Sequence, residues 1–281
     1  MKTVGEILQL TVQCLKEKGE GRRAAEALLA FVLKCERLQL YMQFDKPLIE
    51  EELEMMRGFV KRKLKGEPLE YILGSVKFYG CTLQITPAVL IPRVETEILL
   101  EKVCARLKLR EPHLGKVVWD VCCGAGALGI GLKKALPDYS VTLSDLSGEA
   151  LELARTNAVL NQVEIRCVQG DLLTPFEGQK ADVFLCNPPY VSLQEYQDLD
   201  ASVKNYEPKA ALVGGADGLF FYKRLSEELP LSLNSRALVF LEIGASQGEA
   251  VRSLFSAPCW RRGSVEKDWA GHDRFFSLEF V

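Results

Sequence analysis

The residues with the clearest chemical meaning are the tetrapeptide Asn187-Pro188-Pro189-Tyr190, which directly follows an apolar run at 183–186. Two successive prolines fix the backbone and remove two N–H donors, so the Pro188 carbonyl and the Asn187 side chain remain as acceptors for one NH₂ group. Tyr190 can cover that planar group with its ring. Accepting both hydrogens shifts electron density onto the nitrogen, which suits methylation of an amide or an exocyclic amine. Asn187, Pro188 and Tyr190 are therefore candidate catalytic residues, and Pro189 completes the predicted substrate site; the plainer alternative is a proline-rich turn.

A second candidate site follows the apolar run 117–121, where the chain reads Cys122-Cys123-Gly124-Ala125-Gly126 before a helical pattern begins. Bare backbone at a helix N-terminus suits a nucleotide-like ligand. The glycine spacing, with Asp145 about 20 residues further on, also satisfies the dinucleotide fingerprint. However, Asp120 beneath the loop would repel a pyrophosphate and would attract a ligand that carries an ammonium and a sulfonium. We expect a cationic nucleoside here, and a nicotinamide-dependent oxidoreductase stays open as an alternative.

Two further acids are expected at the carboxyl ends of neighbouring strands. Asp145 ends the second predicted strand, and Asp171 follows the third, next to Leu172. Open α/β sheets bind ligands at this edge, so one acid can hold a ribose and the other an adenine amino group. The alternative is that each acid only caps the following helix.

The order of the elements explains how these residues come together. Helical periodicity over 3–66 predicts a bundle of three or more helices, and 73–88 resembles a β-hairpin around Tyr79-Gly80-Cys81 whose turn uses the glycine. After a helix at 95–109, apolar runs at 117–121, 141–143, 164–168, 183–186 and 237–243 alternate with helical patterns at 127–136, 148–160 and 219–229. This alternation predicts a doubly wound α/β fold. The expected domains are a helical substrate-recognition domain at 1–72, a hairpin connector at 73–88 and a catalytic domain at 89–281.

Composition narrows the class of protein. The 281 residues include 35 Lys and Arg against 38 Asp and Glu, a net charge of −3, which disfavours a long nucleic-acid footprint. The nine cysteines form no Cys-x-x-Cys pair, and the two histidines, His113 and His272, stand alone, so we expect neither disulfides nor a metal site. Without a long apolar window or a signal-peptide pattern, the expected location is the cytoplasm, without membrane contact.

Together, the tetrapeptide after the fourth strand and the glycine-rich loop after the first resemble a class I S-adenosylmethionine-dependent methyltransferase with a Rossmann-like sheet. Within that class, the segments 67–74, 78–80, 90–97, 206–212 and 241–244, followed by Gln247-Gly248, resemble the HemK/PrmC family of peptide-chain release factor glutamine methyltransferases. The similarity covers most of the chain from 67 to 281. The N-terminal helices match the family's substrate-recognition bundle by arrangement only.

The resemblance implies that a methyl group is transferred from S-adenosylmethionine, leaving S-adenosylhomocysteine, to the side-chain amide nitrogen (N5) of the glutamine in the Gly-Gly-Gln motif of class I release factors. Asn187 and the Pro188 carbonyl would hold that amide. The expected cofactor-binding residues are Asp120, Cys122, Cys123, Gly124, Ala125, Gly126, Asp145, Asp171, Leu172 and Asn187. The segment with Arg93, Thr96 and Glu97 would lie near the active site, although both charges could instead brace the following helix.

One departure from the family pattern concerns the loop, where Cys122 and Cys123 stand in place of the first glycine and its neighbour. A Cβ at Cys122 restricts positive φ and narrows the space beside the methionine part of the cofactor.

The closest rival function is a DNA N6-adenine methyltransferase, which uses the same tetrapeptide on a flipped base but would ordinarily carry a basic recognition region. A non-catalytic binding module is a further alternative. We expect a monomer that makes no direct contact with nucleic acid.

Overall fold

The computed structural model describes residues 2–16, 21–111 and 115–281, which fall into two compact units. The first contains residues 1–74 and 201–206, and the second contains 75–200 and 207–281. The second unit thus includes the hairpin that the sequence analysis treats as a separate connector, and the short helix α10 (Ala201–Tyr206) groups with the N-terminal unit. In the described residues, no helix is both long and apolar enough to cross a bilayer.

The N-terminal unit is helical, as its periodicity predicts. Its helices are α1 (Val4–Leu15), α2 (Gly21–Val32), α3 (Arg37–Met42), α4 (Glu50–Leu64) and α5 (Leu69–Leu73). Thr3 begins α1 with a reciprocal capping box to Glu6, which satisfies two backbone donors at the helix start. The apolar faces of α1 and α2 meet in a core that includes the fully buried Leu28 and Leu29.

The second unit is built on a seven-stranded sheet in the order β5-β4-β3-β6-β7-β9-β8. The strands are β3 (Val117–Val121), β4 (Ser140–Asp145), β5 (Arg166–Gln169), β6 (Ala181–Cys186), β7 (Leu233–Glu242), β8 (Trp260–Lys267) and β9 (Asp273–Phe280). The first five run parallel, and β9 and β8 add an antiparallel end. The strand order reverses between β3 and β6, so the carboxyl ends there open onto a crevice.

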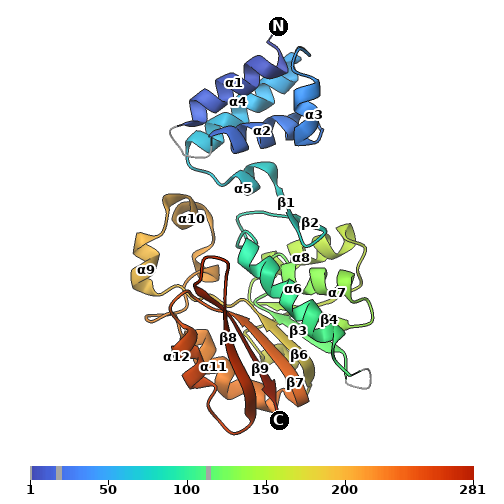
Figure 1. The fold of residues 1–281 in the computed structure, drawn as a ribbon, viewed down its shortest axis with the longest axis vertical. Helices are drawn as coiled ribbons and strands as arrows, with labels where there is room; N and C mark the ends of the chain where they lie inside the picture. The colour runs from blue at the N-terminus through green and yellow to red at the C-terminus, as the bar shows by residue number, and fades with distance from the viewer. Residues whose placement is uncertain (1, 17–20, 112–114) are drawn as a thin grey trace. The chain divides into compact units, whose positions relative to one another are not determined.

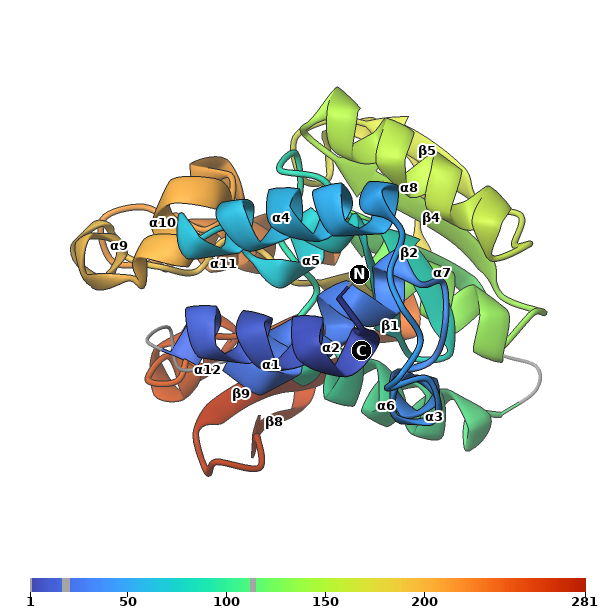
Figure 2. The same cartoon turned by 90° about the horizontal axis from the view of Figure 1, so that it is seen from above.

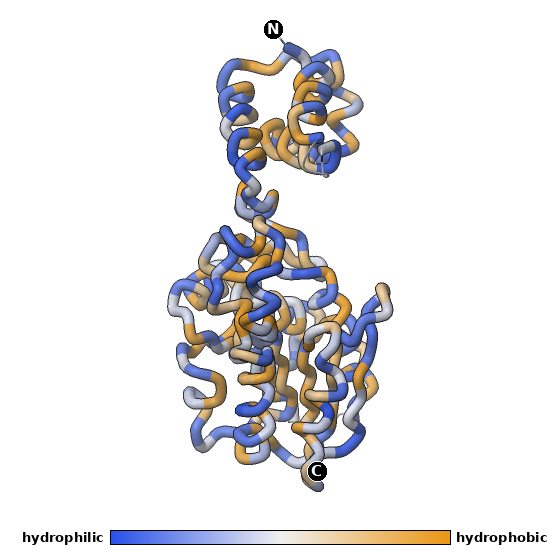
Figure 3. Tube along the Cα trace, turned by 90° about the vertical axis from the view of Figure 1, so that its left-hand side faces the viewer, coloured by the Kyte–Doolittle hydropathy of each residue, from blue (hydrophilic) through white to orange (hydrophobic). Residues whose placement is uncertain are grey.

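Helices cover both faces of this sheet (Figures 1 and 2). One face carries α6 (Val94–Lys108), α7 (Ala127–Ala135) and α8 (Gly148–Leu160), and the other carries α11 (Phe220–Glu228) and α12 (Gly248–Leu254). Short helical turns, α9 (Leu193–Asp198) among them, complete the chain between β6 and α11. Hydrophobic and hydrophilic stretches alternate along the chain (Figure 3), and β6 is buried at every residue. The expected α/β architecture is therefore present, with strand ends within a few residues of those predicted.

The hairpin of β1 (Ser75–Phe78) and β2 (Cys81–Gln84) turns through two residues with positive φ, Tyr79 at 44° and Gly80 at 72°. Both values fit the tight turn that matches the twist of a two-residue hairpin. The Glu97 carboxylate accepts a hydrogen bond from the Tyr79 N–H at 2.7 Å, which ties the turn to α6. Glu97 therefore braces the hairpin against α6, a structural role different from the bracing of the following helix that the sequence suggested.

Candidate functional site

A cavity of about 480 Å³ opens at the carboxyl ends of β3, β4, β5 and β6. This volume lies in the usual range for small-molecule sites, and the place is the one at which open α/β sheets bind ligands. Its lining contains the predicted residues Asp120, Cys122, Cys123, Gly124, Ala125, Asp145, Asp171, Leu172, Asn187 and Pro189. The predicted residues Gly126, Pro188 and Tyr190 are not among the residues that line it. Residues from four strand ends are thus brought to one cavity.

The loop after β3 uses left-handed backbone at three positions: Cys122 has φ 58°, Gly124 has φ 52° and Gly126, the N-cap of α7, has φ 82°. A Cβ at Gly126 would come within 2.8 Å of the Ile130 side chain, so glycine is needed there for space as well as for conformation. At Gly129, a Cβ would lie 2.3 Å from Leu143, which shows how closely α7 packs on β4. Cys122 adopts a conformation that favours glycine, so this residue holds local strain.

We expect Cys122→Gly to raise the free energy of unfolding relative to Cys122→Ala by about 1 kcal/mol, because only glycine adopts this φ without a Cβ penalty. Both variants lose the thiol, and the comparison therefore isolates the backbone. Urea unfolding of the two proteins measures the difference. An alanine variant as stable as the glycine variant would show that the loop holds no strain at this residue.

Two acids lie beneath the loop. Asp120 is 1% exposed, and its Oδ2 accepts a hydrogen bond from the Gly129 N–H at 2.8 Å. Asp145 accepts from the Gly124 N–H at 2.8 Å and from the Ser147 N–H at 2.9 Å. Burial raises the pKa of Asp120 to about 7 and also raises the pKa of Asp145. In the described part of the chain neither carboxylate has a cationic side chain as a partner, so the cavity floor favours a positively charged ligand.

Since the pKa of Asp120 is raised in the folded state, its contribution to stability is fully present below the ordinary value of 3.8 and is lost as pH rises through about 7. We therefore expect the ligand-free protein to lose less stability between about pH 4 and about pH 7 when Asp120 is replaced by Asn. Thermal unfolding at a series of pH values provides the measurement. A pH dependence unchanged by Asp120→Asn would mean that Asp120 does not titrate in this range.

Asp171 lies two residues beyond the end of β5, and both of its carboxylate oxygens are 2.8 Å from Nη1 of Arg224 on α11. This ion pair fixes the carboxylate at the cavity wall. A carboxylate offers about four lone-pair positions, so acceptor capacity remains for a ligand. Leu172 beside it is buried and has a positive φ of 47°.

The tetrapeptide at the end of β6 is held from two sides. The Asn187 amide Nδ2 donates to the Thr96 hydroxyl at 3.2 Å. The Tyr190 hydroxyl donates to Oε1 of Glu242 at 3.3 Å, and the Gln247 side-chain amide donates to the Tyr190 carbonyl at 3.0 Å. Pro188 lies between the two lining residues Asn187 and Pro189. Asn187 therefore keeps its nitrogen inside the protein and its oxygen available toward the cavity.

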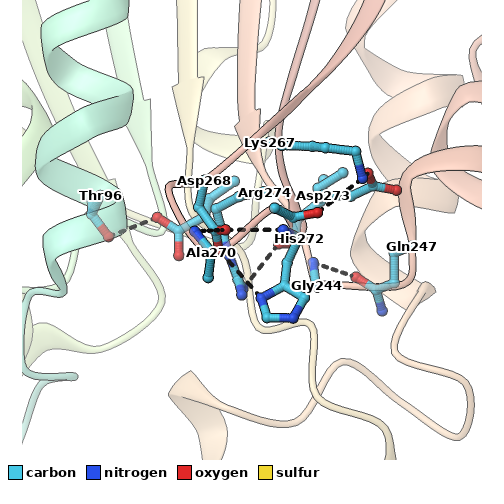
Figure 4. Close-up of polar contacts among 12 residues, drawn as sticks. Thr96, Gly244, Gln247, Lys267, Asp268, Ala270, His272, Asp273 and Arg274 are labelled. Atoms are coloured by element: carbon cyan, nitrogen blue, oxygen red, sulfur yellow. Dashed lines mark hydrogen bonds and ion pairs between the residues drawn. The ribbon is translucent and has the colours of Figure 1, made fainter.

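Glu242, the last residue of β7, accepts hydrogen bonds from both Thr96 and Tyr190. Its Oε2 accepts from the Thr96 hydroxyl at 2.6 Å, a contact drawn from Thr96 in Figure 4, and its side chain is 1% exposed. Burial raises the pKa of Glu242 to about 7, against the lowering effects of the Thr96 hydrogen bond and the nearby Arg274 charge. In the same view, the Gln247 side chain bonds the Gly244 N–H. From the sequence, Thr96 is expected only near the site, and Glu242 and Gln247 have no predicted role in it.

The cavity wall also contains two segments that the sequence analysis did not assign to the site, residues 87–92 and 208–211. They are joined by Glu207, which is buried, accepts from the Ile91 N–H at 3.1 Å and forms an ion pair with Arg93. Arg93 therefore braces two distant segments and does not contact the cavity. Pro87 and Pro92, which bracket the first segment, were the available sequence signal.

Among the described residues, no group of His, Cys, Asp and Glu side chains could hold a metal ion, and all nine cysteines are free. Burial raises the pKa of the Cys123 and Cys186 thiols well above its usual range, which makes both poor nucleophiles. His272 lies in the hairpin of β8 and β9, and His113 falls outside the described residues. The chemistry of the site therefore rests on oxygen acceptors and bare backbone.

Solved structures with a similar fold include a methyltransferase from Pyrococcus furiosus, 20% identical, with a TM-score of 0.53 over 72% of this chain and 89% of that one. Another is a Thermus thermophilus 16S rRNA N2 G1207 methyltransferase in complex with AdoMet and guanosine, 17% identical, with a TM-score of 0.50 over 73% of this chain and 49% of that one. These likenesses identify the fold as that of class I methyltransferases.

Matches to family models and to relatives with similar sequences identify the family. The PrmC N-terminal domain matches residues 6–74, and the methyltransferase small domain matches residues 94–204. A release factor glutamine methyltransferase from Chlamydia trachomatis is 41% identical over 92% of this chain and 87% of its own. The proteins of that name from Geobacter sulfurreducens and Bacillus subtilis are each 39% identical, over 97% and 98% of this chain and 95% and 96% of their own. The chain belongs to the release factor glutamine methyltransferase family.

Proposed function

We propose that this protein transfers a methyl group from S-adenosylmethionine to N5 of the glutamine in the Gly-Gly-Gln motif of class I peptide-chain release factors, and so acts in translation termination. The observation that carries this proposal is the orientation of Asn187. Its nitrogen is engaged by Thr96, so its oxygen is available to accept a hydrogen bond from a planar amide at the cavity. The family relationship supplies the substrate.

The residues of the cavity fit S-adenosylmethionine. Buried Asp120 and half-buried Asp145, neither with a cationic partner among the described residues, suit a ligand with an ammonium and a sulfonium, and Gly124, which has no side chain, allows close approach to the backbone. Asp145 would accept from ribose hydroxyls, and Asp171 with the backbone at Leu172 would bind the adenine edge. When bound, S-adenosylmethionine supplies an electrophilic methyl group on a positively charged sulfur.

The protein's own residues then hold the acceptor. Asn187 Oδ1 and the Pro188 carbonyl would accept the two hydrogens of the glutamine NH₂ group, which increases electron density on the nitrogen as it is methylated. Tyr190, fixed through both its hydroxyl and its carbonyl, would pack over the planar amide. Pro189 completes the wall, and buried Asp120 stabilises positive charge at the floor of the cavity.

The other functions considered are less well supported. A DNA adenine methyltransferase would use the same tetrapeptide, but the relatives are named release factor glutamine methyltransferases. The chain's net charge of −3 also disfavours DNA as the substrate. Asp120 argues against a pyrophosphate at the loop and hence against NAD, and the ordered acceptor site argues against a purely binding role. We further propose a cytoplasmic monomer that contacts release factors and no nucleic acid, a location consistent with nine free cysteines.

Two measurements test cofactor and substrate class together. We expect calorimetry to detect binding of S-adenosylmethionine and not of NAD. With a labelled methyl group, we expect transfer to purified release factor and none to duplex or single-stranded DNA at matched concentration. Label on adenine would assign the protein to the DNA adenine methyltransferases. Binding of NAD without binding of S-adenosylmethionine would contradict the proposed cofactor.

A further inference from the structure

The contacts behind the tetrapeptide form one continuous chain of hydrogen bonds. Asn187 Nδ2 donates to Thr96 Oγ1 at 3.2 Å, Thr96 Oγ1 donates to Glu242 Oε2 at 2.6 Å, and the Tyr190 hydroxyl donates to Glu242 Oε1 at 3.3 Å. The two oxygens of one buried carboxylate thus serve both polar side chains of the tetrapeptide, one directly and one through a hydroxyl.

The parallel sheet explains why Glu242 lies at this place. Cys186 of β6 pairs with Leu241 of β7, so the next residues along the two strands, Asn187 and Glu242, are neighbours at the edge of the cavity. Thr96 approaches from the first turn of α6 and is itself 4% exposed. Three elements far apart in the sequence therefore meet at one buried polar cluster.

The chemistry of each member dictates the orientation of the next. An ionised carboxylate only accepts hydrogen bonds, so Thr96 must direct its single hydroxyl hydrogen to Glu242. The Thr96 oxygen can then only accept from Asn187, and the amide nitrogen is the group of Asn187 that donates. Asn187 Oδ1 is consequently left to face the cavity. With a protonated Glu242, the Thr96 hydroxyl would be able to donate to Asn187 instead, and the amide could turn over.

We propose that Glu242 and Thr96 are positioning residues that fix the Asn187 amide with its oxygen toward the methyl acceptor, an inference that rests on the proposed function. Thr96 also lines the cavity, but its hydroxyl is engaged by Glu242 and Asn187, and Glu242 is not a lining residue. Their effect passes through Asn187 and, for Glu242, also through Tyr190.

The charges around Glu242 set the pH at which this arrangement forms. Arg274 of β9 lowers the pKa of Glu242, Glu95 of α6 raises it, and burial brings it to about 7. Arg274 itself is shared with Asp268, 3.4 Å away, and with the Ile243 carbonyl at 3.3 Å. The Tyr222 hydroxyl of α11 donates to the main-chain carbonyl of Glu242 at 2.8 Å, away from its carboxylate. Ionised Glu242, and with it the oriented amide, therefore becomes more populated as pH rises through about 7.

The first test compares turnover among variants with saturating S-adenosylmethionine, a condition that removes effects on its binding. We expect Thr96→Val to lower kcat by roughly 10- to 100-fold with little change in KM for release factor, because Asn187 loses its acceptor. Thr96→Ser should restore most of the rate. In an Asn187→Ala background, Thr96→Val should add little further loss, since its effect passes through Asn187. Additive losses, or a full-speed Thr96→Val variant, would overturn the inference.

The second test follows pH. We expect kcat of the unsubstituted protein to rise with pH through about 7, and this rise to be clearly smaller in Glu242→Gln, in which only the titration of Asp120 is left unchanged. Asp182→Asn is the matched control, because Asp182 is a buried carboxylate at the opposite end of β6, bonded to the Val117 N–H and to Asn234. It should reduce stability while keeping the pH profile. A Glu242→Gln variant that retains the whole rise would overturn the role of Glu242.

A third test does not depend on activity. In protein labelled with ¹⁵N at asparagine, the Asn187 side-chain signal is identified by its loss in Asn187→Ala. We expect its shift to titrate between about pH 5.5 and about pH 8.5 in the unsubstituted protein and not in Glu242→Gln. A signal that does not titrate would contradict the inference. If release factor is never methylated, the proposed function fails, and this spectrum still decides whether Glu242 orients Asn187.

Discussion

Replacing Asn187 with Ala should lower kcat by roughly 10²- to 10³-fold, or about 2.7–4 kcal/mol, because it removes a preorganised acceptor that matters most as the glutamine nitrogen is methylated. Binding of S-adenosylmethionine should stay close to that of the unsubstituted protein, since the acids at the cavity floor are untouched. Steady-state kinetics with release factor, together with calorimetry, measure both quantities. A full-speed alanine variant would show that the tetrapeptide is only a turn, and the mechanism would have to be abandoned.

Asn187→Asp is the more informative companion. Asp keeps an acceptor at nearly the same place but cannot donate to Thr96, whose hydroxyl hydrogen is already directed to Glu242. Two carboxylates would then compete for one hydroxyl. We expect this variant to be much slower than the unsubstituted protein while it still binds S-adenosylmethionine. High activity of the Asp variant would mean that acceptance of the NH₂ hydrogens is all that the site requires.

Asp145→Ala should weaken binding of S-adenosylmethionine by about 1.5–3 kcal/mol, the usual scale for hydrogen bonds to a charged group. Asp145 would bind ribose hydroxyls, and it also holds the loop through the Gly124 and Ser147 N–H groups, so the ligand contact and the shape of the cavity are lost together. Calorimetry measures the effect.

Asp138→Ala supplies the control for Asp145, because Asp138 is exposed and forms an ion pair with Lys116 at the surface. It should leave binding unchanged. If Asp145→Ala binds as tightly as this control, Asp145 is a cap of the following helix and takes no part in holding the ribose.

Much of the fold could be predicted from the sequence because its signals are local. The apolar runs at 117–121 and 183–186 lie in β3 and β6, and the pattern at 148–160 became α8 with the same ends. The tetrapeptide and the glycine-rich loop are each a short, continuous motif, and each follows one of two neighbouring strands. Their meeting at one cavity therefore followed from the topology alone. Asp145 and Asp171 were placed by the same argument.

Other parts depend on pairings that no local pattern shows. Glu242 reaches Thr96 across 146 positions of sequence, and Glu207 reaches Arg93 across 114, so neither partner could be chosen from spacing. The antiparallel end of the sheet requires β9 to enter between β7 and β8, which alternation of apolar residues does not specify. The grouping of 201–206 with the N-terminal unit likewise arises from packing that is distant in sequence.

The most direct test of the central claim is fragment mass spectrometry of purified release factor after incubation with this protein and S-adenosylmethionine. We predict one added methyl group, located on the side chain of the glutamine in the Gly-Gly-Gln motif, and none when that glutamine is replaced by alanine in the release factor. Unmodified release factor, or a methyl group on any other residue that persists after this replacement, would contradict the account.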